Sequence, residues 1–185
     1  MSEQDHKIHV YYGFGKGKTT SGMGLSLRAA GAGKTVAIVQ FDKGYDGKNE
    51  HYSERHLLRT IPGIELHPTG CERMQPDGTF RFKNQPEDFE EAKRGLGLAR
   101  KLIEEEKQDL LFLDEILATV KYHLLKKEDV MSLLDHYDRH RRFELVLTGH
   151  VVWDELIERV DLVTEMRKVK HYFDEGTAAR KGIEF

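Results

Sequence analysis

Apolar and polar positions along this chain form blocks that predict buried strands separated by amphipathic helices. Short, largely apolar runs are typical of strands that are covered on both faces of a parallel sheet. Such runs occur at Ile8–Tyr12, Val36–Phe41, Leu110–Leu113 and Phe143–Leu147, and a last strand is predicted at Leu162–Met166.

The segments between these runs have helical spacing. Met23, Leu27 and Ala30 lie at i, i+4 and i+7, which places them on one face of a helix. Gly95 and Gly97 interrupt a later helix and should each weaken it by about 1 kcal/mol. Apolar residues at helical spacing mark that helix at Phe89–Ile103, another at Val130–Tyr137 and a short one at Leu156–Val160.

The alternation of strands and helices indicates an α/β fold with a doubly wound, mostly parallel sheet, the fold of phosphate-loop (P-loop) nucleotide-binding proteins. A length of 185 residues fits a single domain, residues 1–185. In such sheets, ligands bind beyond the carboxyl ends of the strands. The turns expected to converge there are Gly13–Thr20, Asp114–Glu115 and Thr148–His150.

Two longer stretches interrupt this rhythm. Residues 42–55 are charged and glycine-rich, and residues 67–86 hold prolines and glycines around Cys71, Phe80 and Phe82. Loops of this length inside a compact domain are usually functional. We therefore expect both loops to form the pocket for a second substrate.

Charge and composition narrow the functional classes. With 29 Lys and Arg against 32 Asp and Glu, the formal net charge is −3, which offers no electrostatic footprint for duplex nucleic acid or an anionic membrane. No apolar stretch approaches the roughly 18 residues of a membrane-spanning helix. Cys71 is the single cysteine, which excludes an intramolecular disulfide, and the first residues lack the apolar region of a secretory signal. We expect a cytoplasmic protein.

The strongest motif is the glycine-rich turn Gly13–Thr20, with the sequence Gly-Phe-Gly-Lys-Gly-Lys-Thr-Thr, between a predicted strand and a predicted helix. Glycines let consecutive backbone N–H groups face an anion, and the helix N-terminus adds partial positive charge. Lys18 would reach the outer phosphates of a nucleotide, Lys16 adds a second positive charge, and the Thr19 hydroxyl would bind Mg²⁺. The turn therefore predicts a nucleotide phosphate site.

An acidic pair supplies the expected partner for the metal. Asp114 and Glu115 follow an apolar strand, and carboxylates at such a strand end can hold Mg²⁺ directly or through water. By itself such a pair is more often a helix cap or turn, but the glycine-rich turn upstream favours a metal site. Arg28 and His150 also fall near this site, where each could contact the nucleotide or serve only in a cap or an ion pair.

One departure affects the type of chemistry. Ordinary phosphate loops place four residues between the first glycine and the Gly-Lys-Ser/Thr triplet, whereas three residues separate Gly13 from Gly17. A shortened loop cannot wrap a triphosphate in the usual register, so hydrolysis of the γ-phosphate does not follow automatically. A P-loop ATPase or kinase is the first alternative function.

With these motifs and several others, the sequence resembles the ATP:corrinoid adenosyltransferases of cobalamin biosynthesis, also called cob(I)alamin adenosyltransferases. The short phosphate loop and the segment Val-Lys-His-Tyr-Phe-Asp-Glu-Gly are together far more specific than a phosphate loop alone. The matching motifs keep the family's order along nearly the whole chain: Gly13–Thr20, Arg28–Gly31, Val39–Gly44, Thr69–Gly70, Leu113–Glu115, Thr148–Gly149, Val169–Gly176 and Gly182–Ile183.

The resemblance implies Mg²⁺-dependent transfer of the 5′-deoxyadenosyl group of ATP to the Co(I) of a corrinoid, with release of triphosphate. In this family the triphosphate lies reversed in the loop, so that the ribose C5′ faces the corrinoid, which agrees with the shortened loop. Co(I) is itself the nucleophile, so the protein would position ATP and stabilise the departing triphosphate.

The resemblance also implies roles for individual residues. For ATP these are Gly13, Phe14, Gly15, Lys16, Gly17, Lys18, Thr19 and Thr20. Arg28 and His150 are added as candidates for ATP binding because of their expected position. For catalysis they are Lys18, Thr19 and Glu115, and for the metal Thr19 and Glu115, with Asp114 as an outer ligand. The implied partners are ATP, a corrinoid substrate, an external reductant such as a flavodoxin-like protein, and a second copy of the chain in a homodimer.

The corrinoid side departs from the family pattern. Family members carry aromatic residues just after the Thr-Gly pair, where they crowd the lower face of the corrin, whereas Thr69 and Gly70 are followed here by Cys-Glu-Arg-Met. This departure keeps a second alternative open, a non-catalytic carrier of corrinoid or nucleotide. The candidates on the corrinoid side are Cys71, Arg73, Phe80 and Phe82, with Tyr45 and Tyr52 as further aromatic residues.

Overall fold

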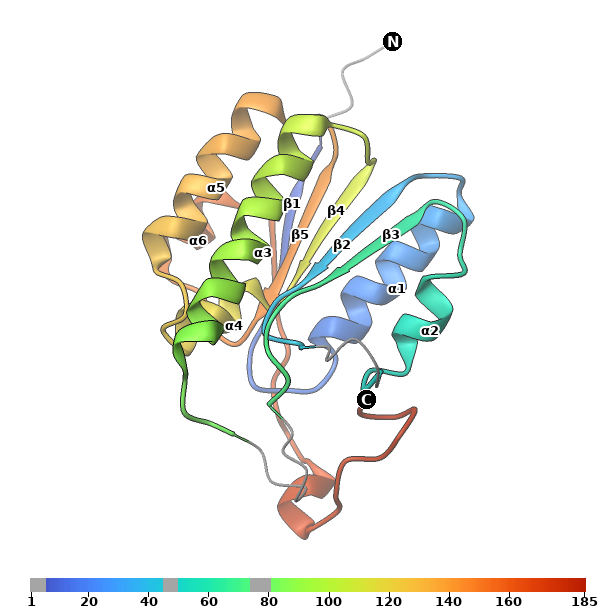
Figure 1. Ribbon diagram of the computed structural model, residues 1–185, viewed down its shortest axis with the longest axis vertical. Helices are drawn as coiled ribbons and strands as arrows, with labels where there is room; N and C mark the ends of the chain where they lie inside the picture. Colours follow the sequence, from blue (N-terminus) through green and yellow to red (C-terminus); the bar gives the residue numbers. More distant parts are fainter. Residues whose placement is uncertain (1–5, 45–49, 74–80) are drawn as a thin grey trace.

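The computed structural model describes residues 6–44, 50–73 and 81–185. Six parallel strands form one sheet in the order β3-β2-β4-β5-β1-β6 (Figure 1). Their bounds are β1 Ile8–Tyr12, β2 Val36–Gln40, β3 Ile64–Pro68, β4 Leu110–Asp114, β5 Glu144–Gly149 and β6 Leu162–Glu165. The predicted α/β fold is confirmed, and the described strands pair in parallel throughout rather than mostly.

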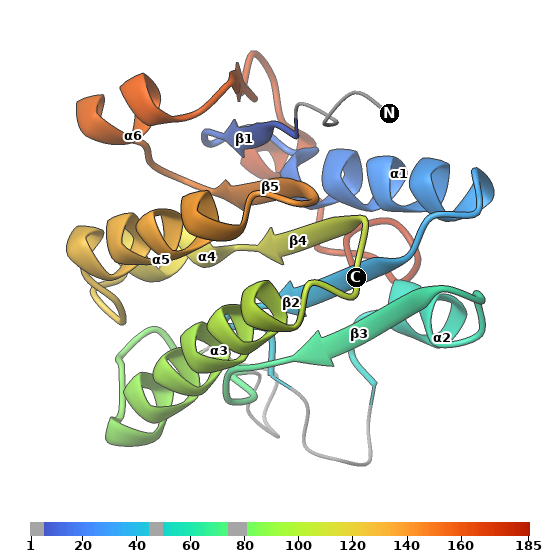
Figure 2. The ribbon, with the colours of Figure 1, turned by 90° about the horizontal axis from the view of Figure 1, so that it is seen from above.

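Helices cover both faces of this sheet (Figure 2). One layer holds α1 (Lys18–Gly31) and α2 (Glu54–Leu58), and the other holds α3 (Pro86–Glu105), α4 (Ile116–Lys121), α5 (Lys127–His140) and α6 (Asp154–Arg159). A 3₁₀ helix at Tyr172–Glu175 follows β6. Within the described ranges, no helix is long and apolar enough to cross a membrane.

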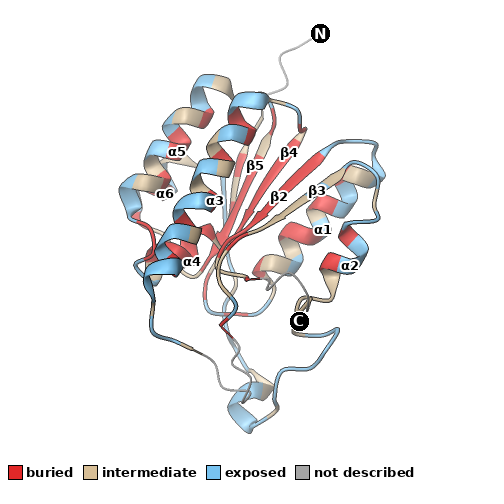
Figure 3. Cartoon of the chain, in the orientation of Figure 1, coloured by how far each residue is buried: buried red, intermediate tan, exposed pale blue. Residues whose placement is uncertain are grey.

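The side chains of the central strands alternate between the two helical layers, which explains their continuously apolar sequences. Val36 and Ile38 of β2 pack in the cluster that includes residues of α1 and α2, whereas Ala37 and Val39 pack with the helices of the other layer. β4 divides its residues in the same way, and both strands are buried along their length (Figure 3). Burial on both faces stabilises the sheet by roughly 25 cal/mol per Å² of apolar surface.

Among the described strands and α-helices, sequence periodicity misses three, namely α2, β3 and α4. The helices α2 and α4 span five and six residues, too few for a periodic stripe. β3 lies at the sheet edge, where it is not fully buried and carries polar side chains. The predicted loops at 42–55 and 67–86 are therefore too long, because α2 begins inside the first and β3 and α3 take the ends of the second.

Gly95 has a packing role that the sequence alone does not reveal. A Cβ atom there would lie 2.8 Å from Cε1 of Phe41 and 2.8 Å from Oγ1 of Thr69, whereas a Cβ atom at Gly97 would meet nothing within 4 Å. Glycine at position 95 thus lets α3 approach the chain that leaves β2 and β3. Gly95 lowers the helix propensity of α3 but lets this helix pack closely on the sheet.

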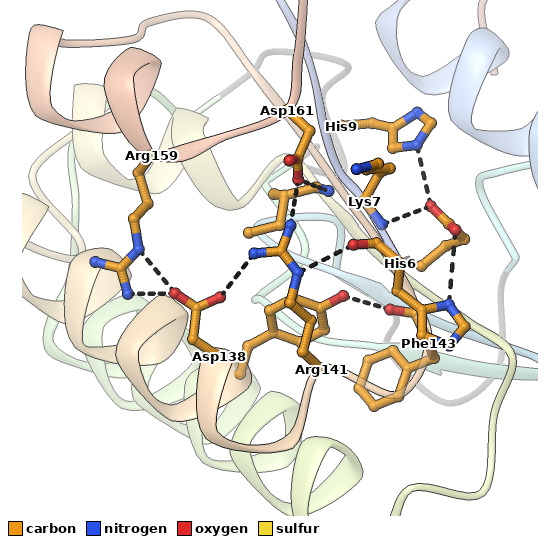
Figure 4. A network of polar contacts seen from close by, with 11 residues as sticks. His6, Lys7, His9, Asp138, Arg141, Phe143, Arg159 and Asp161 are labelled. Carbon is orange, nitrogen blue, oxygen red and sulfur yellow. Dashed lines mark hydrogen bonds and ion pairs between the residues drawn. The ribbon is translucent and has the colours of Figure 1, made fainter. Parts of the chain in front are cut away.

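Ion pairs connect the amino ends of β1 and β6 to α5, at the end of the sheet opposite the glycine-rich turn (Figure 4). Arg141 lies 2.6 Å from Asp161 and 3.3 Å from Asp138, and Asp161 accepts the N–H of Ile8 at 2.7 Å. Arg159 also reaches Asp138 at 2.7 Å. Because these side chains are partly exposed, each pair adds at most about 1 kcal/mol to stability.

Candidate active site

The glycine-rich turn connects β1 to α1 and packs against the chain that leaves β6. Gly13 and Gly17 have φ angles of 114° and 122°, in the region that favours glycine. A Cβ atom at Gly13 or Gly15 would lie 2.6 Å from the carbonyl oxygen of Met166. The Gly15 N–H donates to that same oxygen at 2.7 Å. These glycines are therefore required both by backbone conformation and by close packing.

The two lysines of the turn have different partners. The Lys18 ammonium is buried and donates to the carbonyl oxygen of Gly15 at 3.0 Å. Burial lowers the pKa of Lys18, and the nearby Glu115 carboxylate opposes this effect. The Lys16 ammonium lies 2.7 Å from Oε1 of Glu184, and this hydrogen bond raises the pKa of Lys16. Both lysines line the same cavity.

Asp114 is the centre of a buried hydrogen-bond network at the end of β4. Its carboxylate has no exposed surface and accepts hydrogen bonds from the hydroxyl groups of Thr19 and Thr148, each at 2.9 Å. The Gln40 amide lies 3.4 Å away and the Lys43 ammonium 2.6 Å away. Burial alone would lower the pKa of Lys43, but the charge of Asp114 raises it to about 12. Asp114 and Lys43 thus form a buried ion pair.

Glu115 follows Asp114 and presents a buried carboxylate oxygen that accepts no hydrogen bond from the described residues. Its φ of 63° turns the chain into α4, and its N–H donates to Oγ1 of Thr148 at 2.8 Å. Burial raises the pKa of Glu115, and the charge of Lys43 opposes the rise. Among the described residues, its buried Oε2 has no hydrogen-bond partner. A bound cation would satisfy such an oxygen.

The donor set suits a metal that takes most of its ligands from nucleotide and water. In the described part of the chain, no group of three or more His, Cys, Asp or Glu side chains is suited to a metal ion. Mg²⁺ needs few protein ligands, because phosphate oxygens and water complete its shell. Asp114 already accepts hydrogen bonds from four side chains, so Glu115 is the better direct ligand of the two carboxylates.

Arg55 contributes to this site but is not identifiable from sequence, where it lies in a charged stretch that resembles an exposed loop. Its guanidinium is fully buried and donates to Oε1 of Gln40 at 2.6 Å and to the carbonyl oxygen of Lys43 at 2.5 Å. It also pairs with Glu50 at 3.0 Å. Arg55 thus holds the chain that carries Lys43, a residue for which sequence motifs predict no role.

His150 lies beside the glycine-rich turn. Its Nε2 is 4.0 Å from Oε2 of Glu115, and its ring centroid is 5.7 Å from that of Phe14. The Lys121 ammonium lies over the Phe14 ring at 4.3 Å. Burial, with the charges of Lys18 and Lys121, lowers the pKa of His150 to about 4, so its ring is neutral at pH 7.

A cavity of about 580 Å³ opens beside the turn, between α1, the chain around α2 and the segment Gly182–Phe185, which returns toward α2 (Figure 1). The Phe185 ring stacks on His51 at 4.4 Å, and Ser53 donates to the Phe185 carbonyl oxygen at 3.0 Å. The predicted site residues that line the cavity are Lys16, Gly17, Lys18, Thr19, Thr20 and Glu115.

Arg28 lies away from this cavity. It is an exposed residue in the last turn of α1, about 15 Å along the helix from Lys18. The structure does not bring Arg28 to the cavity, and its predicted contact with ATP stays a prediction.

The chain after β2 crosses the chain after β3, and these crossing segments carry two of the candidates for the corrinoid side, Cys71 and Arg73. A Cβ atom at Gly44 would lie 2.1 Å from the carbonyl carbon of Cys71, and one at Gly70 would lie 2.7 Å from Cα of Asp42. Gly70 has a φ of 103°. Close crossing at these glycines brings residues 42–44 and 69–73 together next to the acidic pair.

The corrinoid-side candidates differ in exposure. Arg73 is buried, with its guanidinium 2.8 Å from Asp42, and so helps to hold the two crossing segments together. Cys71 is half-buried, and burial raises the pKa of its thiol. Phe82 is 85% exposed, whereas Phe80 and Tyr45 lie outside the described residues.

Comparison with known proteins identifies the family. The profile of the family described as "ATP:corrinoid adenosyltransferase BtuR/CobO/CobP" matches residues 4–185. This chain belongs to the ATP:corrinoid adenosyltransferase family. The corrinoid adenosyltransferases of Escherichia coli and Salmonella typhimurium are each 33% identical to it over 178 residues, which cover 96% of this chain and 85% of theirs.

A solved structure supports the fold. A KaiC-like protein from the hyperthermophilic archaeon Pyrococcus horikoshii aligns with a TM-score of 0.51 at 13% identity, covering 87% of this chain and 73% of that one. At this identity the match shows the α/β fold alone. Membership of the adenosyltransferase family confirms the resemblance predicted from the motifs and favours adenosyl transfer over both alternatives, the ATPase or kinase and the carrier.

Proposed function

We propose that this member of the adenosyltransferase family transfers the 5′-deoxyadenosyl group of ATP to the Co(I) of a corrinoid and releases triphosphate. The cobalt electron pair forms the Co–C bond to the ribose C5′, and the C5′–O bond breaks so that its electron pair leaves with the triphosphate. The observation that carries the proposal is the short phosphate loop whose Lys18 shares a cavity with the half-buried acidic residue Glu115.

The protein's part in this reaction is to hold ATP and stabilise the leaving triphosphate. The buried Lys18 ammonium donates a hydrogen bond to the carbonyl oxygen of Gly15 in its own loop at 3.0 Å. Phosphate oxygens can replace this acceptor. A positive charge in a largely buried site interacts more strongly with developing negative charge than it would in water. Lys16 can add a second charge once its contact with Glu184 is exchanged for phosphate.

Thr19 and Glu115 are the side chains that would hold Mg²⁺, with Asp114 behind them. When bound, the ion would neutralise charge on the triphosphate. The hydrogen bond from Thr19 to Asp114, at 2.9 Å, orients the Thr19 hydroxyl. The Oε2 of Glu115, which accepts no hydrogen bond within the described part of the chain, supports this assignment.

The second substrate and the partners form the finer part of the proposal. We place the corrinoid against the loops 42–55 and 67–86, where Cys71, Arg73 and Phe82 lie in or beside the crossing segments. An external reductant, such as a flavodoxin-like protein, would supply Co(I). The enzyme would act in the cytoplasm as a homodimer.

The reaction is tested by anaerobic incubation with Mg²⁺ and ATP, with and without chemically reduced cob(I)alamin, followed by separation of triphosphate from orthophosphate. We expect triphosphate only with the corrinoid, in an amount equal to the adenosylated corrinoid. Orthophosphate released without corrinoid would instead establish a hydrolase, and tight corrinoid binding without turnover would establish a carrier.

Two substitutions test the metal assignment. Thr19→Ala and Glu115→Gln should each reduce transfer by about a hundredfold or more, since each removes stabilisation of the leaving triphosphate. Glu104→Gln is the matched control, because Glu104 is an exposed residue on α3, remote from the cavity. Unchanged transfer in Glu115→Gln would remove Glu115 from the metal site.

A further inference from the structure

The ammonium group of Lys43 lies at the centre of the site, although the sequence motifs predict no role for this residue. Its side chain is 12% exposed, and its ammonium lies 2.6 Å from Oδ2 of Asp114 and 3.0 Å from Oγ1 of Thr19. Thr19 in turn donates to the other oxygen of Asp114 at 2.9 Å. The Lys43 ammonium therefore contacts both Thr19, a proposed metal ligand, and the Asp114 carboxylate behind it.

The position of the Lys43 ammonium affects the net charge that a metal ion would meet at this site. Two carboxylates, Asp114 and Glu115, face two ammonium groups, Lys18 and Lys43, so their formal charges cancel. A divalent cation added to this neutral group would meet the Lys43 charge at short range in a poorly screened environment. Without Lys43, the same group would carry a net negative charge and would attract the cation.

The backbone of Lys43 is held, so its side chain is the part that can move. The Lys43 N–H donates to the carbonyl oxygen of Thr69 at 3.0 Å, and its own carbonyl oxygen accepts from the buried Arg55. The Tyr52 ring, whose centroid lies 5.3 Å from the ammonium, lines the same cavity and gives the cation an aromatic face on the way out. Because Lys43 itself lines this cavity, a change of its side-chain rotamer would carry the charge from Asp114 toward a bound nucleotide.

We propose that Lys43 is a positioning residue that acts as the resident cation of the metal site in the nucleotide-free protein. Divalent metal enters between Thr19 and Glu115 only together with nucleotide, whose phosphates draw the Lys43 ammonium away from Asp114. Metal binding is thereby coupled to nucleotide binding. This inference rests on the proposed function, since it takes the metal site from there.

The test measures Mn²⁺ binding by electron paramagnetic resonance, and thermal unfolding in EDTA or in Mg²⁺, all without nucleotide. The variants are Lys43→Gln, which removes the charge, Lys43→Arg, which keeps it, and Lys101→Gln, a control on the exposed face of α3. We expect Lys43→Gln to bind Mn²⁺ at least about tenfold more tightly than the wild type, Lys43→Arg and Lys101→Gln. It should also melt below the wild type in EDTA and recover in Mg²⁺.

Two results would overturn the inference. One is Mn²⁺ binding by Lys43→Gln that is no tighter than in Lys101→Gln. The other needs no variant: wild-type protein that binds Mn²⁺ equally well with and without a non-hydrolysable ATP analogue. Adenosyl transfer by the wild type is measured separately, so a failed reaction with the expected Mn²⁺ behaviour counts against the proposed function and not against the role of Lys43.

Discussion

At the scale of single residues, two adjacent carboxylates differ because of their surroundings. Asp114 accepts from four side chains and is paired with Lys43, whereas Glu115 keeps a buried oxygen without a hydrogen-bond partner among the described residues. Thr148 serves both, because its hydroxyl donates to Asp114 and accepts from the Glu115 N–H. The different roles proposed for the two acids follow from these contacts.

The first prediction concerns Thr148, which is fully buried. Thr148→Val should lower the free energy of unfolding by about 2 kcal/mol or more, because it leaves a buried N–H and a carboxylate each short of one hydrogen bond. Thr148→Ser keeps the hydroxyl and should lose only about 1 kcal/mol for the missing methyl group. Urea unfolding distinguishes the two, and equal losses would show that the hydroxyl contributes little.

The second prediction concerns His150, whose pKa is lowered from 6.5 to about 4, chiefly by burial. Between these values the unfolded chain binds a proton at this ring and the folded protein does not. Stability should therefore fall as pH drops from about 6.5 to 4, by up to about 1.4 kcal/mol per pH unit. This slope should be smaller in His150→Gln when urea unfolding is repeated across that range. Parallel curves for the two proteins would contradict the lowered pKa.

At the scale of elements, close approach decides which glycines matter. α3 contains two glycines two residues apart, which look equivalent in the sequence, yet only Gly95 faces Phe41 and Thr69. A second contact between separate elements joins the segment Gly182–Phe185 to the glycine-rich turn, through the ion pair between Lys16 and Glu184. Each contact gives a test with a matched control.

The third prediction compares Gly95→Ala with Gly97→Ala. The first should destabilise the protein by about 1 to 3 kcal/mol, because a methyl group would overlap the buried Phe41 ring. The second meets nothing within 4 Å and should stabilise by up to about 1 kcal/mol through helix propensity. Chemical unfolding of both variants checks the difference in sign, and stabilisation by both would contradict the packing.

The fourth prediction concerns Glu184, whose pKa is lowered by hydrogen bonds from Arg180, Lys16 and Tyr172. Glu184→Gln removes the charge that holds Lys16, so the lysine becomes available to phosphates. ATP should then bind about two- to tenfold more tightly in isothermal titration calorimetry. Glu175→Gln, in an exposed pair with Lys170, is the control. Weaker ATP binding in Glu184→Gln would mean that the segment supports the nucleotide rather than competes with it.

At the scale of the whole molecule, the parallel sheet separates a structural end from a functional end. Ion pairs such as Arg141–Asp161 connect elements at the amino ends of the strands, whereas the cavity and the acidic pair lie at the carboxyl ends. The segment after β6 extends to the functional end and forms a wall of the cavity (Figure 1). A ligand should therefore affect one end of the molecule only.

The fifth prediction follows from this division. Binding of Mg²⁺ and ATP should slow amide hydrogen exchange in residues 16–20 and 182–185, because both segments line the cavity. The turn before β2, at residues 33–35, lies at the other end of the sheet and should exchange at an unchanged rate. Equal protection at both ends would indicate global stabilisation instead of ligation at this cavity.

Sequence reasoning succeeds where neighbouring residues suffice. The buried runs predict the central strands correctly because β2 and β4 are covered on both faces. The phosphate site at Gly13–Thr20 stays a prediction, which the sequence allows because its glycines, lysines and threonines are contiguous. It fails for β3, whose edge position leaves mixed polarity, and for α2 and α4, which are too short for periodicity.

The sequence by itself determined the fold class and, through ordered motifs, the family, and it predicts the phosphate-binding turn and the acidic pair as parts of the site. Only the tertiary structure placed Lys43 against Asp114, buried Arg55 beneath Gln40 and brought Glu184 to Lys16, across 71, 15 and 168 residues of chain. These contacts join residues from different elements and loops that are separated along the chain, so no local sequence pattern reveals them. In the sequence, these charged residues resemble those of an exposed loop. In the folded protein, burial removes water from the charged groups, so each group needs a specific partner.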